Sequence, residues 1–321
     1  MYFKQFLDER VGCASYLIAS RQTHEAAIVD PSIETEQYAA LLRERGFTLR
    51  YLIDTHVHAD HVSGARKLAA SMPGDVEICL HESARVTYPF RGLRDGDELA
   101  LGQLRLRVLH TPGHRPELIS LLIVNPERSP EPSMMLTGDS LLVGDVGRPD
   151  FGGGDAADQY ASVTRLLALP DWVAVFPGHF EGPGGKGMCG RPSTTVGFER
   201  RFNPIVQLVR EVFVTQLAGE VPARPLNITA IEATNRGEAD LAWAMLTTSP
   251  PVPEIGTEEL ANRAEDAVVL DVREPAEYDA GRVPGAINLP QADLATRLEE
   301  LPPHTPLLLV CQGGYGSLRA A

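Results

Sequence analysis

Residues Thr55–His61 read THVHADH and hold four potential metal ligands, three histidines and one aspartate, within six positions. This stretch follows the short apolar run Tyr51–Ile53, which predicts a buried strand. In α/β proteins, residues that follow a strand gather at one edge of the sheet, and binding sites usually form there. The stretch therefore predicts an α/β fold with a metal site at a sheet edge.

Three more potential ligands follow other short apolar runs in the same way. His114 closes the segment HTPGH, Asp139 closes TGD and His179 closes PGH. Neutral imidazoles and a carboxylate suit borderline divalent metals, and two histidines with one carboxylate leave open positions, as in non-haem Fe(II) centres that bind O2. Any one of these histidines alone would more often be a surface or hydrogen-bonded residue. The prediction of a metal site therefore depends on their occurrence together.

The chain has 321 residues, of which 43% are hydrophobic, and this suits one large domain and a smaller one. Strands are predicted by the apolar runs Ala26–Val29, Tyr51–Ile53, Val76–Leu80, Leu104–Leu109, Leu118–Val124, Met134–Leu136 and Val173–Phe176. Helices are predicted over Glu34–Arg45, with Gly46 as a left-handed stop, and over Asp155–Leu167 and Ile205–Leu217. Such a mixture of strands and helices predicts an α/β sandwich.

The formal net charge is -14 and the basic residues form no cluster, which argues against nucleic acid as a partner. The apolar run Leu118–Val124 is far shorter than a membrane span, so no membrane partner is expected. Asp8, Glu9 and Arg10 interrupt the apolar N-terminal residues, which argues against a signal peptide. Together with four widely spaced cysteines, this predicts free thiols and a cytoplasmic location.

The sequence Ser249–Pro253 (SPPVP) predicts a linker, because consecutive prolines stiffen the chain and exclude a helix or a central strand. We place the domain boundary there. The first domain is then residues 1–248, with a core of about 1–200 and a helical extension to 248. The second domain is residues 254–321, in which a further α/β pattern begins.

The segments THVHADH, HTPGH, TGD and PGH together resemble the metallo-β-lactamase superfamily over about residues 1–200. The resemblance implies an αββα sandwich with the metal at one rim. Two branches of the superfamily share these segments: thioester hydrolases of the glyoxalase type, which use two zinc ions, and persulfide dioxygenases, which bind one iron. For the dioxygenases the resemblance implies the iron ligands His56, His114 and Asp139. The residues that would then orient the ligands and tune the pocket, or fill the second metal site of a hydrolase, are His58, Asp60, His61 and His179.

The segment Gly147–Phe151 (GRPDF) favours the dioxygenase branch, because it resembles the GR-x-DF element that follows the TGD aspartate in that branch. Hydrolases usually also carry a helical thiol-binding tail, which we do not identify in this sequence. The resemblance implies that Arg148, with Asp150 and Phe151, shapes the pocket or holds an anionic substrate. A solvent-exposed loop arginine is the alternative, since arginines are mostly exposed.

The Gly-rich segment Gly184–Arg200 is similar to one in bacterial dioxygenases that are fused to sulfurtransferase domains. Its backbone, with Lys186 and Arg191, would receive the carboxylates or phosphates of a thiol carrier. A surface loop without this role is an equally good interpretation.

The C-terminal segments Val268–Tyr278 and Gly281–Pro290, followed by CQGGYGS from Cys311, resemble a rhodanese domain. The resemblance makes Cys311 the catalytic sulfur carrier, with helix-start N–H groups stabilising its thiolate or persulfide; the alternative is a buried small hydrophobic residue. Gly316 stands where the family usually has an arginine, and the chain stops at Ala321. A partial α/β rhodanese-like domain would leave core surface uncovered, so we expect weak or absent transferase activity.

Taken together, the resemblances imply an iron-dependent dioxygenase with one Fe(II) per chain. It would oxidise a low-molecular-weight thiol persulfide, such as glutathione persulfide, with O2 to sulfite and free thiol. The rhodanese-like domain would exchange sulfane sulfur among thiosulfate, sulfite and thiol. The alternatives are a hydrolase with two Zn ions and a sulfur-carrier or regulatory protein with a vestigial metal fold. The sequence leaves open the thiol carrier and whether the protein is a homo-oligomer.

Overall fold

A computed structural model of the protein describes residues 1–9, 11–181, 188–219, 228–239, 255–264, 267–290, 293–297, 300–302 and 305–311. The chain divides into two compact units, residues 1–222 with 229–244 and residues 223–228 with 245–321. The predicted linker Ser249–Pro253 and the end of the predicted helical extension lie outside the described residues, so the boundary at that position stays a prediction.

The first half of unit 1 forms a six-stranded sheet with its strands in chain order. These strands are β1 (Tyr2–Asp8), β2 (Cys13–Ala19), β3 (Glu25–Val29), β4 (Thr48–Ile53), β5 (Glu77–His81) and β6 (Arg91–Leu93). The pairs β1–β2 and β2–β3 are antiparallel, and the pairs from β3 to β6 are parallel. The carboxyl ends of β3, β4 and β5 therefore lie at one edge of the sheet, where the loop that carries THVHADH begins.

The second half of unit 1 forms another six-stranded sheet, in the order β12-β11-β10-β9-β8-β7. Its strands are β7 (Glu98–Leu101), β8 (Leu104–His110), β9 (Ile119–Val124), β10 (Met134–Gly138), β11 (Ala174–Pro177) and β12 (Thr194–Thr195). Of the pairs in this sheet, β10–β11 is parallel and the others are antiparallel. Asp139 and His179 therefore follow two neighbouring strands at the same edge.

The two sheets pack face to face, and side chains from both fill one apolar core that includes Ile18, Ile53, Val108, Ile123 and Leu136. Alternate residues of the same strands point outward, as the period of two in a strand requires.

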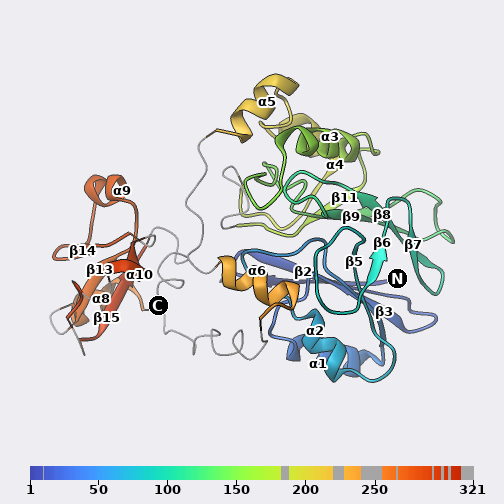
Figure 1. The fold of residues 1–321 in the computed structure, drawn as a ribbon, viewed down its shortest axis with the longest axis horizontal. Helices are drawn as coiled ribbons and strands as arrows, with labels where there is room; N and C mark the ends of the chain where they lie inside the picture. The colour runs from blue at the N-terminus through green and yellow to red at the C-terminus, as the bar shows by residue number, and fades with distance from the viewer. Residues whose placement is uncertain are drawn as a thin grey trace. The chain divides into compact units, whose positions relative to one another are not determined.

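Helices cover the two outer faces of this pair of sheets. The helices α1 (Glu36–Arg45) and α2 (Ala65–Ser71) bury Tyr38, Leu42 and Leu68 against the first sheet. The second sheet is covered by α3 (Ala156–Leu167), α4 (Val196–Phe202) and α5 (Arg210–Leu217). Figure 1 shows α1 and α2 on one side of the sheets, and α3 and α4 on the other. This is the αββα sandwich that the resemblance implies, and the fold prediction is confirmed.

The helix ends follow the local signals of the sequence. Gly46 ends α1 in the left-handed conformation with φ 64°, as predicted, and its N–H donates to the Arg43 carbonyl. Asp155 precedes α3 and accepts hydrogen bonds from the N–H groups of Ala157 and Asp158 at 2.8 and 2.9 Å.

The predicted helix over Ile205–Leu217 is wrong at its start, because α5 begins at Arg210. Asn203 accepts a hydrogen bond from the Ile205 N–H and begins a turn, and Val209 has the extended ψ of 152° that interrupts a helix. The apolar residues of this turn still pack against the core of the second sheet. The spacing of Ile205, Val206 and Leu208 therefore indicates burial and does not indicate a helix.

Unit 2 contains a three-stranded parallel sheet in the order β14-β13-β15. Its elements are α8 (Thr257–Arg263), β13 (Val268–Asp271), α9 (Pro275–Ala280), β14 (Ile287–Asn288), α10 (Leu294–Arg297) and β15 (Leu307–Val310). Leu270, Val272, Leu289 and Leu294 form its buried core. Parallel strands joined through helices are the α/β pattern that the sequence predicts here. Across the described part of the chain, no helix has the length and apolar character needed to cross a membrane.

Candidate metal centre

The predicted iron ligands meet at the sheet edge in unit 1. His56 follows β4, His114 lies between β8 and β9, and Asp139 follows β10. The Nε2 atoms of His56 and His114 lie 3.8 and 3.5 Å from Asp139 Oδ2. All three residues are buried, with at most 3% of their surface exposed. The structure thus gathers two imidazoles and one carboxylate around a common point, as a group that could hold a metal ion.

These distances fit a shared ion better than direct hydrogen bonds. Ligand atoms about 2.0–2.2 Å from one ion lie roughly 3.0–3.6 Å from each other, so the 3.5 Å separation lies within this range and the 3.8 Å separation slightly above it. A hydrogen bond between imidazole and carboxylate would instead draw the atoms to about 2.8 Å. The three side chains therefore fit a metal ion at their common point.

The second ring nitrogen of each of these histidines is fixed by a partner. His114 Nδ1 donates to the Arg148 carbonyl at 2.7 Å. Thr55 Oγ1 donates to Asp30 Oδ2 at 2.9 Å, so it accepts from His56 Nδ1 at 3.0 Å. In both rings the proton is then on Nδ1, and Nε2 presents its lone pair to the common point.

The environment also sets the charge state that metal binding requires. Burial, reinforced by His58 and His114, holds the pKa of His56 well below its usual range. Burial likewise lowers the pKa of His114, despite the nearby carboxylate. Burial alone would raise the pKa of Asp139, but His179 outweighs it and lowers that pKa. Neutral imidazoles beside an ionised carboxylate are the protonation states of metal ligands.

His179 connects this triad to a neighbouring group that consists of Cys13, Asp60 and His61. Its Nδ1 donates to Asp139 Oδ1 at 2.7 Å, and its Nε2 lies 2.8 Å from Asp60 Oδ2. Burial alone would lower the pKa of His179, but Asp139, with Cys13 and Asp60, raises it well above the usual range. His179 therefore orients the Asp139 carboxylate and presents its other nitrogen to Asp60.

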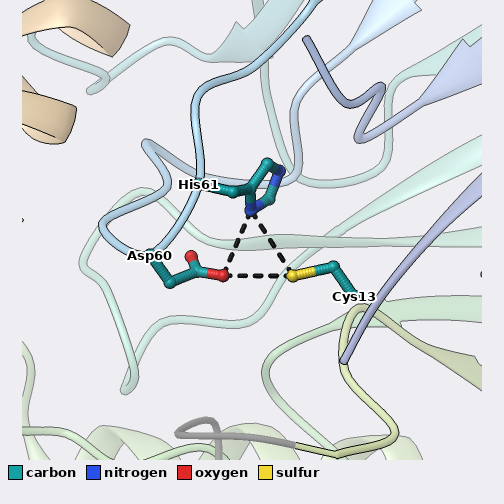
Figure 2. Close-up of side chains that lie close together, drawn as sticks. All are labelled: Cys13, Asp60 and His61. Carbon is teal, nitrogen blue, oxygen red and sulfur yellow. Dashed lines mark hydrogen bonds and ion pairs between the residues drawn. The ribbon is translucent and has the colours of Figure 1, made fainter. Parts of the chain in front are cut away.

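Cys13, at the start of β2, lies in this neighbouring group, as Figure 2 shows. Its Sγ is 3.2 Å from Asp60 Oδ2, 3.7 Å from His61 Nδ1 and 3.2 Å from His179 Nε2. No signal in the sequence could place Cys13 here, because it is an isolated cysteine, 47 residues from Asp60.

His58 belongs to a third group, with Asp30 and Asp54, which the sequence also does not reveal. Its Nε2 donates to Asp30 Oδ1 at 3.0 Å. Its Nδ1 is buried, and the part of the chain that the structure describes offers it no hydrogen-bond partner. Burial, partly offset by His58, raises the pKa of Asp54 to about 6.

The residues of the GRPDF segment pack beside His114. Arg148 binds Asp150 through two hydrogen bonds of 2.5 and 2.7 Å, and its guanidinium lies 5.0 Å from the centre of the Phe151 ring. The Phe151 ring is 5.1 Å from that of His114, edge to face. Arg148 is only 8% exposed, so the alternative of a solvent-exposed loop arginine is wrong.

The other two predicted substrate-binding residues are Lys186 and Arg191. Arg191 is exposed, and Lys186 lies outside the described residues. Their role toward a thiol carrier stays a prediction.

Gly147 explains why a glycine opens the GRPDF segment. A Cβ atom at this position would lie 1.8 Å from the Asp139 carbonyl oxygen and 3.2 Å from His114 Cβ. The segment therefore packs its backbone directly onto two of the predicted ligand residues.

Helix α6 (Ile228–Arg236) is bonded to both of the loops that carry histidine ligands. Asn235 Nδ2 donates to the carbonyls of His58 and His61 at 2.9 and 2.8 Å, and Asn235 Oδ1 accepts from the Ser63 N–H at 2.9 Å. On the other loop, the buried Arg115 donates to Glu232 Oε1 at 2.7 Å. These partners are more than 100 residues away in sequence, which hides them from pattern analysis.

In unit 2, Cys311 directly follows β15, as predicted, and is partly exposed. In the segment Asp271–Glu274 (DVRE), Arg273 forms hydrogen bonds of 2.9 and 2.6 Å with the Asp271 carboxylate. The predicted helix start after Cys311, with Gly316 and Ala321, lies outside the described residues.

The fold and the site together define a metal-dependent enzyme of the αββα class, with its ligands on loops at one edge of two facing sheets. Comparison with known families agrees with this class. The chain belongs to the metallo-beta-lactamase superfamily, whose family model matches residues 8–179. A second model, of the rhodanese-like domain, matches residues 256–321.

The relatives of the chain include named persulfide dioxygenases. The human protein named "Persulfide dioxygenase ETHE1, mitochondrial" is 34% identical over 211 residues, which cover 64% of this chain and 76% of the relative. The crystal structure of ETHE1 from Myxococcus xanthus matches with 32% identity and a TM-score of 0.66, over 74% of this chain and all of that one. A metallo-beta-lactamase structure from Staphylococcus aureus is 29% identical with a TM-score of 0.70, over 99% of this chain and 93% of that one. The chain is thus a homologue of named persulfide dioxygenases and carries a rhodanese-like domain.

Proposed function

We propose that this protein is a persulfide dioxygenase that binds one Fe(II) through His56, His114 and Asp139. It oxidises a low-molecular-weight thiol persulfide, such as glutathione persulfide. The outer sulfur becomes sulfite, O2 is reduced, water supplies the third oxygen, and the carrier leaves as the free thiol. The observation that carries the proposal is the buried triad of two oriented imidazoles and one carboxylate.

When bound, an Fe(II) ion supplies open coordination positions for O2 and sulfur. The chain's own residues prepare these positions. Asp30, acting through Thr55, fixes the His56 ring, and His179 fixes the Asp139 carboxylate. Phe151 covers the His114 ring and limits the access of water. We assign the binding of the persulfide carrier to Arg148, with Asp150 and Phe151 beside it.

For unit 2 we propose rhodanese-type sulfur transfer at Cys311. A thiolate there would attack a sulfane donor, take its outer sulfur as a cysteine persulfide and release the donor as sulfite or thiol. Sulfite made in unit 1 can accept sulfane sulfur to give thiosulfate, so the two activities share a product and a substrate. The four free cysteines fit a reducing compartment, which we propose is the cytoplasm.

The dioxygenase proposal is tested by measuring O2 uptake of the iron-loaded protein with glutathione persulfide. His114→Ala and Asp139→Ala should lose both bound iron and O2 uptake. His110→Ala is the matched control, because His110 lies in the same HTPGH segment but donates to the Pro116 carbonyl instead of facing the triad. Unchanged O2 uptake by Asp139→Ala would remove this residue from the mechanism and contradict the proposal.

A thioester hydrolase with two zinc ions is the second candidate, and the buried Nδ1 of His58 favours it. This nitrogen is available to a metal, whereas the one-iron arrangement gives it no ligand role. Metal analysis separates the candidates: about one iron per chain supports the dioxygenase, and about two zinc ions support the hydrolase. His58→Ala should retain the single iron of a dioxygenase but release zinc from a hydrolase.

A further inference from the structure

We propose that Arg115 and Glu117 are positioning residues for the metal triad, because their buried ion pair fixes the loop that carries His56 against the loop that carries His114. The inference rests on the metal site of the proposed function, but it does not depend on the reaction carried out there. It also holds for one bound ion or two, since both candidate functions use these two histidines as ligands.

Both peptide groups that flank His56 are bound by residues of the other histidine-bearing loop and the strand that follows it. On one side, the Thr55 carbonyl accepts a hydrogen bond from the Ile119 N–H at 2.9 Å. On the other side, the Val57 N–H donates to Glu117 Oε1 at 3.2 Å. The backbone of His56 is therefore held on both sides, and Glu117 makes the one of these two contacts that depends on a side chain.

Arg115 holds the carboxylate that makes this contact. Its Nε donates to the same atom, Glu117 Oε1, at 3.2 Å, and its Nη1 donates to Glu232 Oε1 at 2.7 Å. Glu232 also lies 3.6 Å from the Arg236 guanidinium, so two cations balance two carboxylates. Arg115 is 2% exposed and Glu117 is 5% exposed. Water therefore has little access to replace either partner of this ion pair.

The turn that carries the ion pair is short and stiff. Pro116 stands between Arg115 and Glu117 and fixes one backbone dihedral of the turn. Arg115 directly follows His114, so local geometry sets the position of Glu117 relative to that ligand. The contact of Glu117 with the other loop then sets the separation of the two histidines.

Stability alone does not require an ion pair at this place. Apolar side chains of similar volume often stabilise a buried position as well as an ion pair does. A carboxylate oxygen, in contrast, holds an N–H group in a defined direction. The presence of Arg115 and Glu117 beside two ligand residues therefore points to orientation of the ligands as their role.

The test measures the affinity of the metal-free protein for Fe(II), by competition with a chromogenic chelator in the absence of O2. Glu117→Leu keeps a similar volume but lacks the acceptor, and it should weaken iron binding by about 10–100-fold, as the loss of groups that orient metal ligands does. Glu117→Gln should bind iron nearly as tightly as the parent protein, because its amide oxygen still accepts the Val57 N–H. This difference between two variants of similar size separates orientation from space filling.

Glu25→Leu is the matched control. Glu25 Oε2 also accepts a backbone N–H from a distant segment, that of Gly102 at 2.8 Å, but Glu25 lies at the start of β3, at the opposite end of this strand from the metal site. Its iron affinity should equal that of the parent protein. Adding Arg115→Met to Glu117→Leu should cause no further loss of affinity, because Arg115 acts through Glu117.

Hydrogen exchange of the metal-free parent protein provides a measurement that needs no variant. The Val57 amide should be protected before any ion binds, since Glu117 already holds it. Exchange of Val57 at the rate of an unprotected amide, or parent-like iron affinity of Glu117→Leu, would overturn the proposal. A protein that binds iron as expected but oxidises no persulfide would contradict the proposed function and leave this inference standing.

Discussion

Replacing Gly147 with alanine should damage the metal centre although Gly147 carries no ligand. The new Cβ would lie 1.8 Å from the Asp139 carbonyl oxygen. Nonbonded heavy atoms prefer a separation of about 3.5 Å, so the two segments must move apart by roughly 1.7 Å. Arg148 follows directly and supplies the carbonyl that holds His114 Nδ1 at 2.7 Å. Relief of the clash therefore displaces Asp139, His114 or both.

The expected size of the effect follows from this displacement. Overpacking of a well-packed site costs about 1–3 kcal/mol. For a unit of this size, each kcal/mol lowers Tm by about 2–4 °C, which gives a loss of about 2–12 °C. A misplacement of 1 Å in an active site can reduce the rate by about 100-fold. We therefore expect a large fall in O2 uptake and in bound iron together with a moderate loss of stability.

Gly152→Ala is the matched control, because its Cβ would meet only the Arg115 guanidinium, at an ordinary 3.6 Å. Iron content, O2 uptake with glutathione persulfide and thermal unfolding are measured for both variants and the parent protein. The reasoning is refuted if Gly147→Ala is indistinguishable from Gly152→Ala in iron content and O2 uptake.

Two further predictions concern other parts of unit 1. Asn235→Ala should destabilise the unit by about 2–4 kcal/mol in urea unfolding, because it leaves two buried backbone groups and one partly buried backbone group without their partner. A loss below about 1 kcal/mol would show that these groups find other partners. Burial and the stacked His110 ring, 3.9 Å away, lower the pKa of His81, so on acidification the unfolded chain takes up the proton first. The stability of the parent protein should therefore fall as the pH drops below about 6.5. The variant His81→Asn keeps an acceptor for Ser83, and between about pH 7.5 and pH 5.5 it should lose less stability than the parent protein. An equal loss in the two proteins would exclude His81 as the source.

Much of unit 1 could be predicted from local sequence. The apolar runs Leu118–Val124 and Met134–Leu136 correspond to β9 and β10 because a strand buried on both faces needs apolar residues at every position. The motifs after the strands also predicted that His56, His114 and Asp139 lie together at a sheet edge, whereas the choice of these three among seven candidate ligands came from the family resemblance and stays a prediction. The failure at Ile205–Val209 has the opposite cause, because an apolar turn and an apolar helix have similar composition.

The contacts that orient the site could not be predicted. Asp30 is separated from His58 by 28 residues, Cys13 from His179 by 166 and Asn235 from His58 by 177. Asp30, Cys13 and Asn235 belong to no motif, and a lone asparagine or cysteine carries no local signal of its partner. Their positions follow from the packing of whole elements, which a single sequence does not encode in any short segment.

The hydrogen bonds that α6 forms with both ligand-bearing loops limit where a shortened or fused version of this chain can be cut. The family match ends at residue 179, yet Glu232 and Asn235 belong to the structural support of the centre. A shortened catalytic fragment, or a chimera with a foreign C-terminal module, should therefore be joined beyond residue 236. A junction placed nearer the family boundary would exchange this support for unrelated sequence and leave Arg115 as a buried cation without the Glu232 carboxylate.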